Sequence, residues 1–179
     1  ETQEMLDYLG VHLMGEEVKP SSMDHAKIVM SHGGEINAPL PGQATGISRY
    51  ELDRLLHENA VNAGAEIVTG TTVTDIQKLG DHRYVVDARQ GNERVRYEAR
   101  VVIGAYGTKK PRTVAAAEEY RDDTVYVGVK SHFSGITIPA RVELYFCDGG
   151  YVGISPIENG TVNVAALLSL NSVQGSGKS

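Results

Sequence analysis

The sequence predicts an α+β fold with a mostly antiparallel sheet, a few helices and a smaller parallel element. Three observations support this. One strongly periodic helical segment lies between β-type segments in the first half of the chain. Most of the remaining sequence alternates apolar and polar residues between Gly, Pro and Asn turns. Residues 101–103 are apolar on both faces, which is typical of a strand inside a parallel sheet.

The first segments predict a short helix followed by a hairpin. Residues 1–10 form the helix, which ends at Gly10. Two short apolar runs, 27–30 and 35–40, are separated by a Gly-Gly pair and predict an antiparallel hairpin. We expect its second strand to end at Pro39, Pro41 and Gly42.

The clearest helix is predicted over residues 49–63. Ser48 and Glu51 have the spacing of a capping box, in which the hydroxyl accepts the amide three residues on and the carboxylate reaches back. Gly64 supplies a left-handed C-terminal stop. The apolar positions that recur at helical period are Leu52, Leu55, Leu56, Ala60 and Ala63.

The rest of the chain predicts short strands in two groups. A short helix over 113–121 is expected between the groups, and the polar tail after residue 170 is expected to be loose. In the second group, Asn159-Gly160 between apolar runs is a strong hairpin signal. The predicted strands cover 65–68, 71–77, 83–89, 94–98, 101–103, 124–133, 140–146, 151–157 and 161–170.

Composition excludes several classes of protein. The 179 residues carry a net charge of −6 with acids and bases interspersed, which argues against nucleic-acid binding. Cys147 is the only cysteine, so neither an intrachain disulfide nor a cysteine metal site can form, and a cytoplasmic location is expected. The six histidines lack metal-ligand spacing, so no metal site is predicted. No membrane-spanning run or signal peptide is visible, and the Glu at position 1 suggests an excised piece.

Two motifs of the sequence resemble phosphate-binding elements. The C-terminal GSGKS is not a phosphate loop, because Ser172 stands where the loop needs its first glycine. Arg49 is a better candidate, since it stands at the first turn of a helix, where free amides and the helix dipole favour an anion. A guanidinium beside those amides could hold a diphosphate through paired hydrogen bonds, although an arginine at this position is usually a surface charge.

The segment ISRYELDRLLHENAVNAGAEIVTGTTVTDI, followed downstream by YEARVVIGAYGTKKPRT, resembles the FAD-dependent oxidoreductases of the p-hydroxybenzoate hydroxylase fold. The geranylgeranyl-reductase-like and halogenase-like branches are the most similar. In this resemblance Arg49 lies near the flavin's diphosphate and ribose, and Val73 meets the adenine through its backbone. The first motif is carried by Arg49, Leu52, Asp53, Leu56, Ala60, Gly64 and Ala65.

Two further motifs extend the resemblance over nearly all of residues 1–170. The first is a Gly-Ala-Asp-Gly motif, here with Tyr106 in place of Asp, which weakens any claim to NAD(P)H-driven hydroxylation. The resemblance implies that Ala105, Tyr106 and Gly107 bind the cofactor, and Arg112 completes the motif. The second, GYVGISPIENGTVNVAAL, has Gly153 where relatives have Trp. We expect the substrate to meet Tyr145, Tyr151 and Pro156.

The resemblance also implies an organisation. Residues 1–179 are expected to be a single compact fragment of a longer enzyme. Ranges 45–78 and 99–112 would belong to a partial, Rossmann-type FAD-binding element, and 11–44 and 122–170 to the substrate-binding sheet. The dinucleotide-binding βαβ unit would lie upstream, because no G-x-G-x-x-G follows a strand here. Alone, the fragment is expected to bind FAD poorly.

The resulting expectation is the middle part of an FAD-dependent oxidoreductase. It would act on an apolar or aromatic small molecule by reductase or monooxygenase chemistry, with FAD as cofactor and NAD(P)H as one candidate electron donor. The residues identify no catalytic acid or base. The alternative is a non-catalytic, β-rich binding domain, which has no reason to carry both the Arg49 helix and the 101–107 segment in this order.

Overall fold

A computed structural model describes residues 2–13, 15, 18–107 and 125–175. The chain divides into two compact units, one formed by 1–65 with 122–179 and the other by 66–121. Where the sequence predicts one compact piece, the structure therefore has two. The first boundary between the units, after residue 65, divides the 45–78 range that the resemblance assigns to the FAD-binding element. The predicted helix over 49–63 therefore belongs to the first unit.

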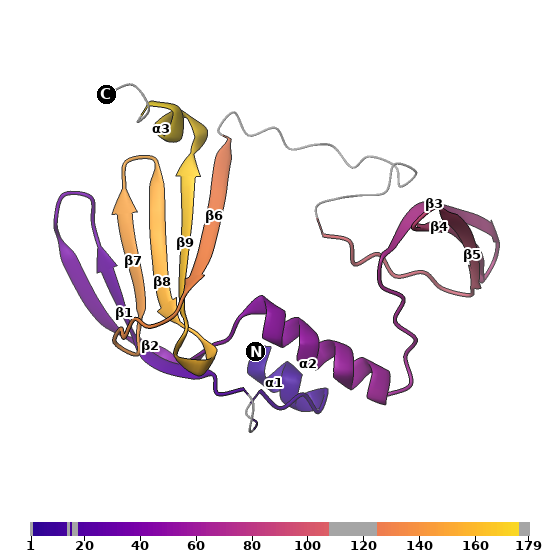
Figure 1. The fold of residues 1–179 in the computed structure, drawn as a ribbon, viewed down its shortest axis with the longest axis horizontal. Coiled ribbons are helices and arrows are strands. Elements are labelled where there is room, and N and C mark those ends of the chain that lie inside the picture. Colours follow the sequence, from indigo (N-terminus) through magenta and orange to yellow (C-terminus); the bar gives the residue numbers. More distant parts are fainter. Residues whose placement is uncertain (1, 14, 16–17, 108–124, 176–179) are drawn as a thin grey trace. The chain divides into compact units, whose positions relative to one another are not determined.

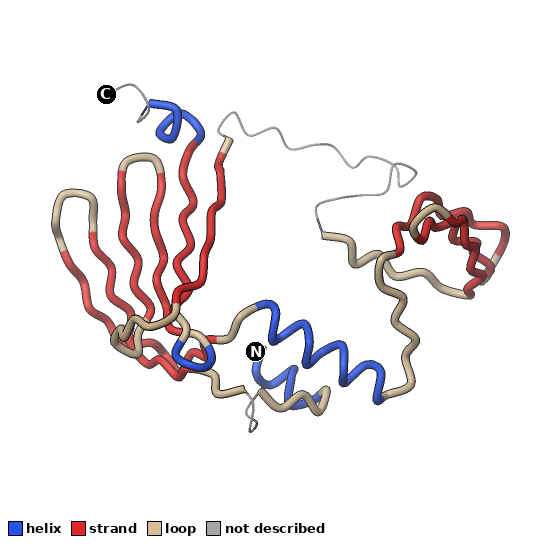
Figure 2. Tube along the Cα trace, viewed as in Figure 1, coloured by secondary structure: helices blue, strands red, loops and turns tan. Residues whose placement is uncertain are grey.

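The first unit is built on a six-stranded sheet (Figures 1 and 2). Its strands lie in the order β2-β1-β7-β8-β9-β6, and every neighbouring pair is antiparallel except β1 with β7. The mixed sheet confirms the predicted α+β class. Its elements are α1 (Thr2–Tyr8), β1 (Ser21–Val29), β2 (Glu35–Gly46), α2 (Arg49–Asn62), β6 (Tyr126–Phe133), β7 (Val142–Cys147), β8 (Gly150–Pro156), the 3-10 turn η1 (Glu158–Gly160), β9 (Val162–Ser169) and α3 (Leu170–Gly175).

The predicted hairpin near the start of the chain is confirmed, but its second strand is longer than expected. β2 continues past Pro39 and Pro41 to Gly46. Both prolines are tolerated because β2 is the edge strand, where a missing N–H need not leave a ladder bond unmade. A register shift between Met23 and His25 of β1 accompanies this stretch.

The second unit contains a three-stranded antiparallel sheet in the order β3-β4-β5. β3 (Thr71–Gly80), β4 (Arg83–Gln90) and β5 (Glu93–Ala99) correspond closely to three predicted strands. Val85 and Ala88 on the central strand are its buried apolar residues among those the structure describes.

Two predicted strands are wrong, and the part of the predicted loose tail that the structure describes is helical. Residues 65–68 and 101–103 are not strands, because neither run has a pairing partner among the described residues. Ile103 is 86% exposed, and the parallel pairing occurs instead between β1 and β7. The tail begins with α3, whose start is capped by the Ser169 hydroxyl accepting from the Ser172 amide at 3.3 Å. The predicted 113–121 helix lies outside the described residues.

The apolar core of the first unit is small. Its buried apolar members among the described residues are Leu6, Val11, Val18, Met23, Ile157 and Val162. Among the helices of the described residues, none combines the length and apolar character needed to cross a membrane.

Candidate functional site

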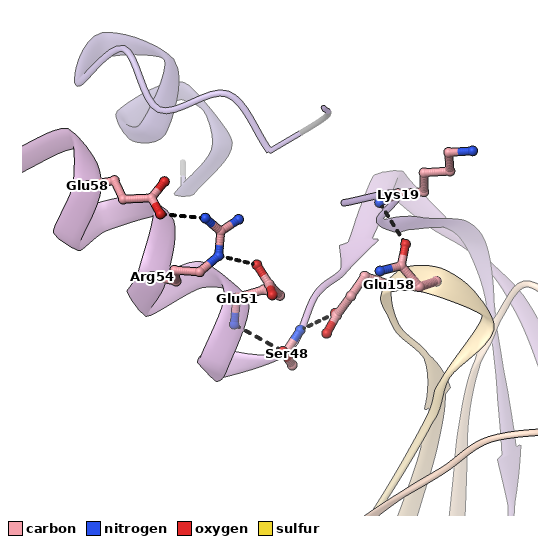
Figure 3. Close-up of polar contacts among 7 residues, drawn as sticks. Lys19, Ser48, Glu51, Arg54, Glu58 and Glu158 are labelled. Atoms are coloured by element: carbon pink, nitrogen blue, oxygen red, sulfur yellow. Dashed lines mark hydrogen bonds and ion pairs between the residues drawn. The ribbon is translucent and has the colours of Figure 1, made fainter. Parts of the chain in front are cut away.

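The start of α2 is held by a network of polar contacts (Figure 3). Ser48 is buried in an extended conformation, and its hydroxyl accepts the Glu51 amide at 3.2 Å, as the predicted capping box requires. The second half of that box is not formed. The Ser48 amide donates to Glu158 at 2.6 Å, while the Glu51 carboxylate accepts from Arg54 at 2.8 Å. The acceptor for the Ser48 amide is therefore Glu158, which is distant in sequence, and not the neighbouring Glu51.

Glu158 belongs to the η1 turn between β8 and β9 and is half-buried. Burial alone would raise the pKa of its carboxyl group, but hydrogen bonding to Ser48 outweighs burial, and His132 adds a smaller lowering. The pKa of Glu158 therefore lies below its usual value. The ionised carboxylate near the positive end of α2 is favourable for the same reason that anions bind helix N-termini.

The same turn also forms hydrogen bonds with the segment that leads into β1. The Lys19 amide donates to the Asn159 side chain at 3.2 Å, and the Asn159 amide donates back to the Lys19 carbonyl at 3.1 Å. The Ser21 hydroxyl donates to the Ile157 carbonyl at 2.7 Å. Because Asn159 has φ 57°, the turn uses the left-handed region that an Asn-Gly pair tolerates. The turn thus fixes α2 and β1 with respect to β8 and β9.

Arg49 follows directly as the first residue of α2. Its side chain is 74% exposed, and its guanidinium is bound to Asp53 one turn later, with Nη2 donating at 3.0 and 3.2 Å and Nε at 3.2 Å. The Asp53 contact orients the guanidinium along the helix and leaves the Nη1 donors out of this pairing. The amides of Arg49 and Tyr50 have no carbonyl one turn earlier in the helix. Nη1 and these two amides are hydrogen-bond donors of the first turn of α2.

Arg49 lies at the edge of a pocket of about 370 Å³ that is formed entirely by the first unit. Its walls are the β2–α2 connection and one face of the six-stranded sheet. The polar lining residues are Thr45, Ser48, Arg49, Lys130, His132, Ser155 and Asn163, and the others are Met23, Ala44, Gly46, Ile47, Val142, Ile157 and Ala165.

The predicted substrate-binding residues lie on two faces of the sheet. Tyr145 pairs with Val152, whereas Tyr151 pairs with Phe146, so the two tyrosines point to opposite sides. Tyr151 is on the side that forms the pocket, and its ring centroid is 5.9 Å from that of Phe146. Pro156 is buried on the side of Tyr145. The three residues therefore cannot line one pocket on a single face.

The predicted cofactor-binding residues are divided between the units. Arg49 belongs to the first, whereas Val73, Ala105, Tyr106 and Gly107 belong to the second. Val73 pairs with Ala88 in the three-stranded sheet, and Gly107 has φ 63°, a backbone conformation that favours glycine. Their convergence on one cofactor stays a prediction. Arg112, which completes the motif, is outside the described residues.

Sequence reasoning did not single out the residues that give the pocket its polar character. These residues lie on β6, β8 and β9, and β7 separates β6 from β8 in the chain: Lys130, His132, Ser155 and Asn163. Lys130 and His132 alternate along one strand, which is a visible signal that they share a face. Their proximity to Ser155 and Asn163 depends on strand register, and the sequence pattern does not supply that register.

Removal of the Ser48 hydroxyl should loosen the start of α2. In a Ser48→Ala variant the Glu51 amide loses its acceptor, and we expect a cost of about 1 kcal/mol. Amide hydrogen exchange of the first turn of α2 would measure the loss, with Ser134→Ala at an exposed position as the control. Unchanged protection in Ser48→Ala would show that the cap contributes nothing to the helix.

Comparison with known sequences gives one short match. No family model matches the chain. A 1H-pyrrole-2-carbonyl-[peptidyl-carrier protein] chlorinase of Pseudomonas fluorescens is 31% identical over 61 residues, which are 34% of this chain and 14% of the chlorinase.

Comparison with solved structures covers almost the whole chain. The myxobacterial chondrochloren halogenase CndH matches with a TM-score of 0.76 and 16% identity over 97% of this chain and 43% of its own. The flavin-dependent halogenase CmlS gives 0.67 and 22% over 97% and 32%. A flavoprotein/dehydrogenase from Cytophaga hutchinsonii gives 0.68 and 18% over 87% and 41%. The chain thus spans less than half of each of these proteins, and it has the p-hydroxybenzoate hydroxylase-like fold of FAD-dependent halogenases and flavoprotein dehydrogenases.

Proposed function

We propose that this chain is the substrate-side part of an FAD-dependent oxidoreductase that acts on a small organic molecule. The fold shared with flavin-dependent halogenases and a flavoprotein dehydrogenase supports the class of enzyme. The single observation that carries the proposal within this chain is the position of Arg49, at the start of a capped helix and at the rim of a pocket on the sheet. Because halogenases and dehydrogenases catalyse different reactions, we propose flavin redox chemistry of reductase or monooxygenase type.

The donors at the start of α2 fit one end of such a cofactor. The Nη1 group of Arg49 and the amides of Arg49 and Tyr50 would hold a phosphate oxygen. Glu158 already occupies the Ser48 amide, so a phosphate would bind further along the first turn. When bound, FAD supplies the electron transfer. The described residues of the first unit hold the cofactor's anionic part, orient the substrate against the sheet and limit access of water.

Replacement of Arg49 should weaken FAD binding in the longer protein that we propose contains this chain. An Arg49→Ala variant loses a charged donor to the diphosphate, and we expect the dissociation constant for FAD to rise about tenfold. Titration of the apoprotein with FAD, followed by flavin fluorescence, gives the value. Arg83→Ala, in the second unit and 3.9 Å from Glu98, removes an exposed arginine outside the pocket and serves as control.

Two results would contradict the assignment. Equal losses in Arg49→Ala and Arg83→Ala would show that overall charge matters and the helix start does not. A longer protein that is colourless and takes up no FAD would remove the flavin proposal and favour the alternative of a non-catalytic, β-rich binding domain.

A further inference from the structure

The sheet wall of the pocket carries two ordered rows of side chains. His132 of β6 lies opposite Asn163 of β9, which in turn lies opposite Ser155 of β8. Neighbouring strands are roughly 4.8 Å apart, so imidazole, amide and hydroxyl form a continuous polar row. The adjacent row begins with Lys130 and Ala165, which line the pocket, and continues to Gly153 just beyond it.

In the second row, small residues lie next to the cationic Lys130. Ala165 and Gly153 have little or no side chain, so no bulky group follows Lys130 along this row. A Cβ built at Gly153 meets only Leu144 Cδ2 at 3.5 Å and the Ala165 carbonyl at 3.8 Å, which are ordinary contact distances. The sheet wall therefore combines a shallow floor, a positive charge at one end and hydrogen-bonding groups along one side.

The charge of the pocket is opposite to that of the chain. The chain has 23 acidic residues and a net charge of −6, yet no Asp or Glu is among the residues that line the pocket. Lys130 makes no ion pair with any residue that the structure describes, in contrast to Lys27, which pairs with Glu35 at 2.8 Å. Two carboxylates lie just outside: Asp53 is engaged by Arg49, and Glu158 by Ser48. The unbalanced cation inside the pocket is Lys130.

We propose that the substrate of the parent enzyme carries a carboxylate, which Lys130 binds while Asn163 and Ser155 hydrogen-bond to the same group or its neighbour. This inference rests on the proposed function, and it narrows the expected apolar or aromatic substrate to one that is also an organic acid. The apolar lining from Met23, Val142 and Ile157 suits the body of such a molecule. A volume of about 370 Å³ is within the usual range for small-ligand sites.

The same oxyanion chemistry could belong to a phosphate of the cofactor, so the test separates the two sources. The chain is titrated in separate experiments with benzoate, with uncharged benzamide of the same shape, and with inorganic phosphate. Backbone amide shifts in NMR spectra report where each probe binds. The variants are Lys130→Gln and the control Lys78→Gln, which removes an exposed lysine of the second unit that is 3.8 Å from Asp81.

The proposal expects saturable benzoate shifts at His132, Asn163 and Ser155, with benzamide about tenfold weaker. Lys130→Gln should weaken benzoate about fivefold and leave benzamide unchanged, whereas Lys78→Gln should change neither. Because Lys130 is exposed, its replacement should leave the spectrum of the free chain intact away from β6.

Equal binding of benzoate and benzamide, or shifts elsewhere in the chain, would overturn the proposal. Phosphate binding at these residues without benzoate binding would also overturn it, because the anion would then be the cofactor's. The proposed function fails separately. Benzoate binding at Lys130 together with a longer protein that takes up no FAD would retain the acid site and remove the flavin.

Discussion

Replacing Gly150 with alanine should destabilise the six-stranded sheet by about 3 kcal/mol, whereas the same change at Gly153 should cost less than about 1 kcal/mol. Both glycines are on β8. A Cβ at Gly150 would lie 1.9 Å from the Leu167 carbonyl oxygen and 2.9 Å from the Leu168 Cα, which are backbone atoms of the neighbouring strand. The collision can be relieved only by separating β8 from β9.

Gly153 is a control on the same strand. Its Cβ would make ordinary contacts, and neither glycine has a backbone φ in the left-handed region, so the comparison isolates the steric term. Amide hydrogen exchange of β8 and β9 in the two variants reports the sheet by itself, which matters because the chain has two units that need not unfold together. If Gly150→Ala and Gly153→Ala lose equal protection, close strand approach does not explain the glycine at 150.

The predicted parts that proved correct are those with local signals. The bounds of α2 follow from Ser48, the helical period and Gly64, all within 17 residues of one another. The β8–β9 hairpin follows from Asn159-Gly160, and both residues have positive φ. In each case the residues that determine the conformation are neighbours in the chain.

The failures involve partners distant in sequence. Residues 65–68 and 101–103 have strand-like composition, but a strand also needs a neighbour to accept and donate its backbone hydrogen bonds. The one parallel pairing among the described strands, between β1 and β7, joins segments more than 100 residues apart. Composition cannot choose between such partners. For the same reason the sequence does not predict the hydrogen bond from the Ser48 amide to Glu158. The capping-box spacing predicts the local Glu51 as the acceptor instead.

The separation of Tyr145 from Tyr151 has a simple geometric cause. β7 and β8 are joined by the two-residue turn Asp148-Gly149, so Cys147 pairs with Gly150 and odd-numbered residues of one strand oppose even-numbered residues of the other. If the turn instead comprised three residues, so that Cys147 paired with Tyr151, the register would shift by one residue and both tyrosines would lie on the same face. Which residues reach the pocket therefore depends on turn length as much as on residue type.

On the face opposite the pocket, removal of the Glu143 side chain should cost about 2–4 kcal/mol at neutral pH. Glu143 is 8% exposed; it accepts from Arg141 Nε at 2.7 Å and from the Tyr145 hydroxyl at 2.6 Å. In Glu143→Ala both donors lose their acceptor, and Arg141, whose side chain is 30% exposed, recovers part of the loss by bonding to water. Glu58→Ala, which breaks an exposed ion pair with Arg54 on α2, should cost less than about 1 kcal/mol.

The same carboxylate should make the sheet sensitive to acid. Burial raises the pKa of Glu143, but hydrogen bonds from Tyr145 and Arg141 outweigh burial, so the folded pKa lies below the ordinary value of 4.5. The stabilisation is therefore fully present above about pH 4.5 and is lost as the pH falls through the folded pKa. A Glu143→Gln variant lacks this dependence, so its stability, from hydrogen exchange of β7 and β8 or from urea unfolding, should fall less steeply with acid. Parallel curves for the parent chain and Glu143→Gln would show that the pKa of Glu143 is the same in the folded and unfolded chain, so that its hydrogen bonds in the sheet do not favour the ionised carboxylate.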